Sequence, residues 1–129
     1  MSSVKRVHLP DLEDAAPKSG LDDLSFRGAR DALGCEKSGL SLQSVAARTR
    51  QPFGHRHDVE EEIYLVLRGG GTLRAGTDEV ALAPLDAVRV APGLTRAIEA
   101  GPEGIEFVAF GSPGGGQGDG EMVPGWWGD

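Results

Sequence analysis

The sequence predicts an all-β sandwich or barrel. Short apolar stretches recur at roughly regular spacing along most of the chain, and turns rich in glycine and proline separate them. No stretch shows the long 3.6-residue apolar period of an amphipathic helix. The 129 residues suffice for one domain with an ordinary core. We divide the chain into an N-terminal edge strand and loop (1–23), a barrel (24–111) and a glycine-rich C-terminal arm that ends in two tryptophans (112–129).

Composition argues against several classes of partner. The chain has 20 acidic and 13 basic residues, so we expect no surface that tracks nucleic-acid phosphates. Its single cysteine, Cys35, cannot form an internal disulfide, and we expect it to be a small buried side chain. The first residues lack the apolar run of a signal peptide, and all apolar runs are shorter than a membrane span. We therefore expect a cytoplasmic protein without a membrane partner.

The elements before the barrel are weakly patterned. Residues 4–9 are an expected edge strand that Pro10 stops. Residues 11–21 are an expected loop with at most one helical turn, and residues 24–33 are a weak strand. Residues 39–46 alternate apolar and polar side chains, which predicts a strand. Further strands are expected after the next motif, at residues 72–75, 79–82, 87–91, 95–100 and 105–110.

Residues 55–69 combine imidazoles and carboxylates in strand spacing. His55 and His57 are two residues apart, so both face the same side of an extended strand. Glu62 and Tyr64 likewise share one face of the strand that follows. Two imidazoles and one carboxylate suit a divalent ion such as zinc, iron, manganese or nickel. The alternative for the two histidines is a polar pair at the mouth of a barrel.

The same stretch resembles the first motif of the cupin family, in which His-x-His is followed by a glutamate and a glycine. His55, His57, Glu62 and Gly69 meet this pattern, with six residues between the last two. Residues 86–96 resemble the second motif, but Arg96 stands where cupins usually have a histidine ligand. The resemblance covers about residues 39–111 and implies a double-stranded β-helix, or jelly-roll barrel. It also implies a homodimer, which residues 4–9 would help to join.

The run of three glutamates leaves a choice of ligand. Glu61 would face the side of Ile63 rather than that of Tyr64, and its distance to Gly69 is one residue too long for the motif. Glu62 is therefore the expected ligand. For Glu60 and Glu61 we expect an ordinary solvated acidic surface.

Arg96 cannot be a fourth metal ligand, because a guanidinium cannot donate a lone pair to a metal. Two arrangements of the site are then open. In one, Arg96 pairs with Glu62 inside a metal-free barrel. In the other, His55, His57 and Glu62 hold the ion and Arg96 binds a small anionic ligand beside it.

Tyr64 is the chain's only tyrosine, and it either packs in the core or contributes its hydroxyl to ligand binding. Three function classes stay open: a metal-dependent oxygenase or isomerase, a binding module with or without metal, and a structural barrel. The fold alone does not choose among them. The expectation is a metal-binding protein with a small-molecule ligand.

The C-terminal arm ends in Trp126 and Trp127 after a glycine-rich stretch. Two adjacent tryptophans in water would expose a large apolar area. We expect the arm to fold back over its own barrel. A lid over the barrel mouth and an arm onto a second subunit are the alternatives.

Overall fold

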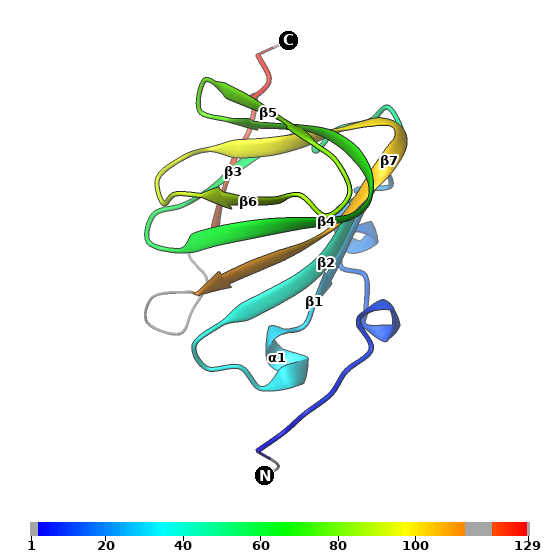
Figure 1. Ribbon diagram of the computed structural model, residues 1–129, viewed down its shortest axis with the longest axis vertical. Coiled ribbons are helices and arrows are strands. Elements are labelled where there is room, and N and C mark those ends of the chain that lie inside the picture. The colour runs from blue at the N-terminus through cyan, green and yellow to red at the C-terminus, as the bar shows by residue number, and fades with distance from the viewer. Residues whose placement is uncertain (1–2, 113–119, 129) are drawn as a thin grey trace.

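The chain folds into a curled antiparallel sheet of eight strands with very little helix (Figure 1). This computed structural model describes residues 3–112 and 120–128. The strands in the described part are β1 (Leu24–Gly28), β2 (Gly39–Val45), β3 (Gly54–His57), β4 (Glu61–Ala75), β5 (Asp78–Leu82), β6 (Ala87–Val90), β7 (Arg96–Ser112) and β8 (Gly120–Val123). The helices are η1 (Leu9–Asp11), η2 (Pro17–Ser19) and α1 (Arg30–Leu33). The all-β prediction is confirmed.

Two long strands, β4 and β7, pair with each other and organise the rest of the sheet (Figure 1). One run of neighbouring strands is β1-β2-β7-β3-β8, while β5 and β6 pair with β4. The β4–β7 register shifts on either side of Gly69, which lies in the left-handed region with φ 71°. A Cβ built at Gly69 would lie 2.0 Å from the carbonyl oxygen of Gly104. Glycine at this motif position therefore lets the two strands bend while they stay paired.

The core lies inside the curl of the sheet. Along β4 the side chains of Glu62, Tyr64 and Val66 are buried, and the residues between them are exposed or partly exposed. Tyr64 meets Phe107 of β7 edge to face, with ring centroids 5.5 Å apart. The strand alternation predicted for residues 62–66 is thus confirmed, and it directs polar and apolar groups into one interior.

The N-terminal segment differs from the prediction. Residues 4–9 form no strand, and the first element is the short helix η1, with Pro10 in its first turn. The segment that follows is held by Asp14, whose Oδ1 accepts hydrogen bonds from the backbone of Ala16 at 3.0 Å and Phe26 at 2.8 Å. The Asp14 side chain thus satisfies two backbone N–H groups, one near it in sequence and one on β1. Residues 24–33, expected as one strand, divide into β1 and α1.

The C-terminal arm folds back onto its own barrel, as predicted. Strand β8 pairs with β3 along Gly54–His57. Trp127 then donates its indole N–H to the backbone oxygen of Gln51 over 2.6 Å, and the Arg50 guanidinium lies 4.6 Å from the centroid of that ring. The glycine-rich linker at 113–119 lies outside the described residues.

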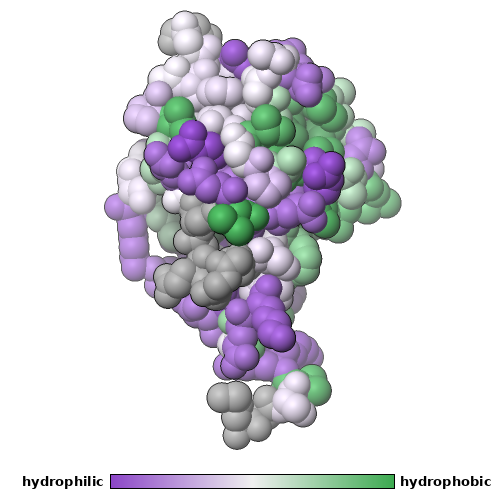
Figure 2. Space-filling view, turned by 90° about the vertical axis from the view of Figure 1, so that its left-hand side faces the viewer, coloured by the Kyte–Doolittle hydropathy of each residue, from purple (hydrophilic) through white to green (hydrophobic). Residues whose placement is uncertain are grey.

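The outer surface carries one apolar region. Figure 2 shows hydrophobic residues gathered on the right-hand side of the molecule, which is the face that β4, β5 and β6 present in Figure 1. Exposed large apolar side chains on these strands and on β7 are Ile63, Leu65, Val80 and Phe110. Within residues 3–112 and 120–128, no helix is long and apolar enough to cross a bilayer.

Candidate metal centre

The three predicted metal ligands come together between β3 and β4. One donor atom from each of His55, His57 and Glu62 lies within 4.8 Å of the others. The Nε2 atom of His55 is 3.3 Å from Oε1 of Glu62, and the Nε2 atom of His57 is 3.7 Å from Oε2 of the same carboxylate. Strand spacing accounts for this meeting, because His55 and His57 point the same way from β3.

These separations suit one divalent ion. Donors bound at about 2.0–2.2 Å in tetrahedral or octahedral geometry lie about 3–3.5 Å apart, so the carboxylate and imidazoles need only small shifts. Two neutral imidazoles and a carboxylate also match borderline first-row metals in softness. The donor set of this chain therefore fits zinc, iron, manganese or nickel.

Glu60 contradicts the expectation of a solvated acidic surface. Its side chain is buried, and its Oε2 lies 2.7 Å from Nδ1 of His57. A carboxylate in this position fixes the proton on Nδ1 and turns the lone pair of Nε2 toward the site. Glu61 is exposed, as expected, and lies 3.6 Å from Arg89. Glu60 has the same strand parity as Glu62, and that was the sequence signal for its burial.

Arg96 lies behind the ligands rather than beside the cavity. Its side chain is completely buried, with 0% exposure. Nη2 donates to Oε1 of Glu62 at 2.9 Å, Nε to the hydroxyl of Tyr64 at 3.3 Å, and Nη1 to the backbone oxygen of Leu94 at 2.9 Å. The pairing of Arg96 with Glu62 anticipated in the metal-free arrangement is present. All three nitrogens of the guanidinium have protein acceptors.

Tyr64 links this arginine to the histidine pair. Its hydroxyl is 3.1 Å from Nε2 of His55 and accepts the hydrogen bond from Arg96. The hydroxyl can therefore donate to the imidazole lone pair that a metal would otherwise take. The phenol is both a core residue, with 2% exposure, and part of the polar cluster.

The local fields fix the charge states of the cluster. Burial raises the pKa of the Glu62 carboxyl, but its interactions with His55, Tyr64 and Arg96 together lower this pKa to about 2. Burial, joined by the Glu62 charge, raises the pKa of Tyr64 well above its usual value, although Arg96 opposes this. Burial lowers the pKa of Arg96, but Tyr64 and Glu62 outweigh it and the pKa is raised. Near neutral pH the cluster holds a carboxylate, a neutral phenol and a guanidinium.

The candidate ligands line a cavity of about 560 Å³. Much of its remaining wall is apolar, formed by Leu21, Leu24, Phe26, Leu40, Phe53, Ala109 and Met122. Glycines make room for the buried polar groups. A Cβ at Gly111 would lie 2.4 Å from Oε1 of Glu60, and one at Gly120 would lie 3.2 Å from the ring of His57. The volume falls in the range of small-molecule sites.

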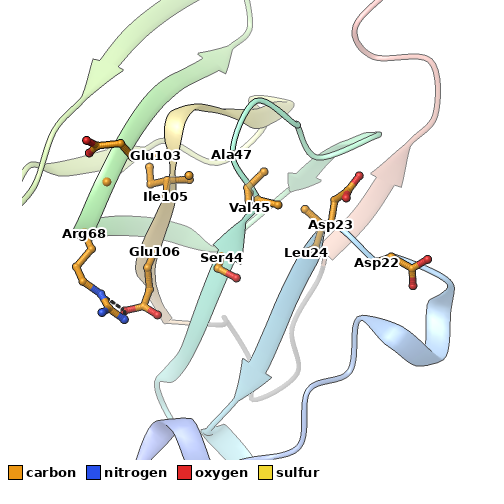
Figure 3. A pocket seen from close by; sticks show the side chains of 13 residues that line it. Asp22, Asp23, Leu24, Ser44, Val45, Ala47, Arg68, Glu103, Ile105 and Glu106 are labelled. Carbon is orange, nitrogen blue, oxygen red and sulfur yellow. Dashed lines mark hydrogen bonds and ion pairs between the residues drawn. The ribbon is translucent and has the colours of Figure 1, made fainter.

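A second hollow, of about 490 Å³, lies at the turns near Gly104 (Figure 3). Acidic residues dominate its charged lining, and the Arg68 side chain turns to Glu106, with 2.9 Å between Nη2 and Oε1 (Figure 3). None of His55, His57 or Glu62 lines it. The cavity that contains the donor set is therefore the candidate site.

Sequence reasoning missed three residues of the site. Glu60 and Gln51 are buried in the cavity wall, and Arg30 reaches the cavity from α1. The amide oxygen of Gln51 accepts a hydrogen bond from the backbone of Ile98 at 2.9 Å, close to Arg96. No motif marks Gln51 or Arg30, because only the packing of separate elements brings them to the site.

Comparisons with solved structures identify the fold. A cupin protein from Bacteroides fragilis superposes with a TM-score of 0.72 and 23% sequence identity, covering 91% of this chain and 90% of the other. The polyketide cyclase RemF from Streptomyces resistomycificus gives a TM-score of 0.70 at 23% identity, with 93% and 84% of the two chains covered. A putative sugar phosphate isomerase from Acidithiobacillus ferrooxidans gives 0.61 at 27% identity, over 70% of this chain and 59% of that one.

No protein-family model matches the sequence, and a search of curated proteins finds no significant match. The structural likenesses nevertheless agree with the curled antiparallel sheet and with the two sequence motifs. The chain has the cupin fold. Its cavity carries a His-His-Glu group of the kind that can hold a metal in a cupin site.

Proposed function

We propose that this protein is a small metal-binding cupin that accepts a small organic ligand in its cavity. His55, His57 and Glu62 hold one divalent ion, and Glu60 orients His57 from behind. The observation that carries the proposal is the approach of both imidazole Nε2 atoms to the two oxygens of one buried carboxylate, at 3.3 Å and 3.7 Å. The bound ion would supply Lewis acidity and open coordination positions for the ligand.

In this proposal Arg96 and Tyr64 do not bind the metal. They contact the residues that do. Arg96 keeps Glu62 ionised and in place through its 2.9 Å contact. An ion bound to Nε2 of His55 would replace the contact of that nitrogen with the Tyr64 hydroxyl, which would then be free to donate to a ligand oxygen.

A metal-free binding barrel is the second candidate, and the Arg96–Glu62 pair favours it. That pair already neutralises the buried carboxylate without an ion. In such a barrel the cavity would bind its ligand through the same polar cluster.

Catalysis is the third candidate function, and its support comes from similar solved structures. One similar structure is described as a sugar phosphate isomerase, a second as a putative sugar phosphate isomerase, and a third contains uridine. These descriptions support a small-molecule ligand for this cavity. An isomerase would use the metal as Lewis acid and Tyr64 or Glu60 as a proton-transfer group. An oxygenase would instead require a redox-active ion such as iron, with dioxygen as the oxidant.

A homodimer is also proposed, through the outer apolar face rather than residues 4–9. Ile63 of β4 is paired with Phe110 of β7, and they are 37% and 43% exposed. Together with Leu65 they form an apolar patch on the outer face of the sheet, which a second copy would cover.

Metal content tests the proposed function. The protein is purified without a chelator or a histidine tag, and metal per subunit is measured for the wild type, His57→Ala and Arg96→His. One ion per subunit that is lost in His57→Ala is the expected result. A wild type that stays empty in the presence of zinc, iron, manganese and nickel, together with an Arg96→His variant that gains metal, supports the metal-free barrel instead.

A further inference from the structure

Arg30 reaches the cavity without a counter-ion among the described residues. It is the first residue of α1, which lies beside the lower end of β2 in Figure 1. Its side chain lines the same cavity as His55, His57 and Glu62, and it is the one lysine or arginine among the described lining residues. Its Nε is buried without a hydrogen-bond partner in the described part of the chain.

The position of this arginine is held by the backbone around it. Ala29, just before it, is completely buried and donates its N–H to the oxygen of Leu40 over 2.8 Å. The Arg30 stem packs over Gly39, where a Cβ would lie 3.7 Å from Cδ of the arginine. The partly buried Arg30 side chain thus starts at the cavity wall, with its Nε buried.

The described acids of the cavity wall have partners other than Arg30. Glu60 lies against His57, and Glu62 pairs with Arg96. The third carboxylate of the lining, Glu121, pairs with Arg56 at 2.8 Å. Each of these three described acids therefore has a partner other than Arg30. A buried guanidinium nitrogen without an acceptor is costly.

We propose that Arg30 is the anion-binding residue of the cavity and that the ligand is a small monocarboxylic acid with an apolar body. A guanidinium binds a carboxylate through two parallel hydrogen bonds. The unpartnered Nε of Arg30 matches a carboxylate oxygen, and the apolar wall of Leu24, Phe26, Leu40 and Phe53 matches a hydrocarbon body. The acid lies with its carboxylate on Arg30 and its other end toward the histidines. The inference rests on the proposed function, since it takes this cavity as the ligand site.

Titration calorimetry with three probes tests the assignment. 3-Phenylpropionate is the acid, 3-phenylpropanamide is its neutral counterpart, and phenyl phosphate carries a second charge. Each is titrated into wild type, Arg30→Gln, Arg30→Lys and the control Arg68→Gln, whose side chain lies at the other hollow. All four proteins are measured as purified and after chelator treatment, with metal content determined in parallel.

The acid is expected to bind the wild type in both states and more tightly than the amide or the phosphate. Arg30→Gln lowers the affinity for the acid roughly tenfold or more, because a charge-assisted hydrogen-bonded pair is lost. The affinity for the amide is unchanged. Arg30→Lys restores part of the affinity, and Arg68→Gln behaves as wild type.

The assignment is overturned if the wild type prefers the amide or the phosphate, if it binds none of the probes, or if Arg30→Gln binds the acid as tightly as wild type does. The measured metal content shows whether the Arg30 assignment or the proposed metal site has failed. A protein that binds the acid through Arg30 but never holds metal refutes the metal site and keeps Arg30. If the protein holds metal and Arg30→Gln binds the acid as tightly as wild type does, the role of Arg30 is refuted and the metal site is kept.

Discussion

The Glu60 carboxylate lies 2.7 Å from Nδ1 of His57, and both side chains are almost completely buried. This contact joins the residue before β4 to the last residue of β3. It sets which ring nitrogen of His57 faces the cavity. The metal affinity of the site should therefore depend on a residue that is not itself a ligand.

Replacing Glu60 with glutamine should lower divalent-metal affinity by roughly tenfold or more, as loss of an outer-shell carboxylate usually does. The amide keeps the volume but removes the charge that holds the His57 proton. Competition with a chromophoric chelator measures the affinity. Glu61→Gln is the matched control, since its exposed side chain faces away from the site, and it should bind metal as wild type does. Equal affinities for the two variants would refute the orienting role.

Removing the Arg96 guanidinium should destabilise the metal-free protein strongly. Arg96→Met leaves the buried Glu62 carboxylate without its 2.9 Å partner, and breaking such a pair typically costs about 3–5 kcal/mol in the free energy of unfolding. Urea unfolding of the chelator-treated protein measures the loss.

Two companion measurements isolate the charge. The double variant Arg96→Met, Glu62→Gln should recover much of the stability, because no unpaired charge stays buried. Added zinc should narrow the gap between Arg96→Met and wild type, since a bound ion takes over the counter-charge. A single variant as stable as wild type without metal would show that the pair does not contribute.

The Asp14 carboxylate should make a small pH-dependent contribution to stability. Hydrogen bonds from the backbone of Phe26 lower its pKa, with burial opposing, and Ala16 and Arg27 lower it further. A pKa below its unfolded value of 3.8 means that the contribution is present above that pH and is lost as pH falls through the lower folded value. Wild type should exceed Asp14→Asn in thermal midpoint at pH 6, and the difference should shrink toward pH 3. A constant difference would contradict this.

Trp127 should stabilise the arm that forms one wall of the cavity. Trp127→Ala removes the indole bond to Gln51 and the stacking on Arg50, and should cost roughly 1–3 kcal/mol. Limited proteolysis should then cut the described arm, residues 120–128, faster than in wild type. Val4→Ala, at an 80% exposed position, serves as the neutral control.

The proposed dimer predicts that a charge on the outer face separates the subunits. Phe110→Lys places an ammonium in the middle of the apolar patch, next to Ile63. Light scattering after size exclusion should give a dimer for wild type and a monomer for the variant. Lysine at Val80, also exposed but farther along the sheet, should leave the mass unchanged if the patch around Phe110 is the interface.

The local sequence pattern was sufficient to predict the strand architecture and the burial of two site residues. Period-two alternation in residues 62–66 and the glycine and proline turns predicted the β architecture and the burial of Glu62 and Tyr64. The His-x-His spacing predicted that both imidazoles point to the same side of β3. These features depend on neighbours within a few residues, so the sequence alone was enough.

Tertiary structure decided what surrounds those groups. Arg96 points into the barrel as alternation predicted, but only the pairing of β3, β4 and β7 shows that Leu94, Tyr64 and Glu62 take all its nitrogens. Arg30 precedes the candidate ligands by more than twenty residues and reaches their cavity only because α1 packs beside β2. Contacts between distant segments are set by how the sheet curls and by which glycines leave room, and no local period encodes them.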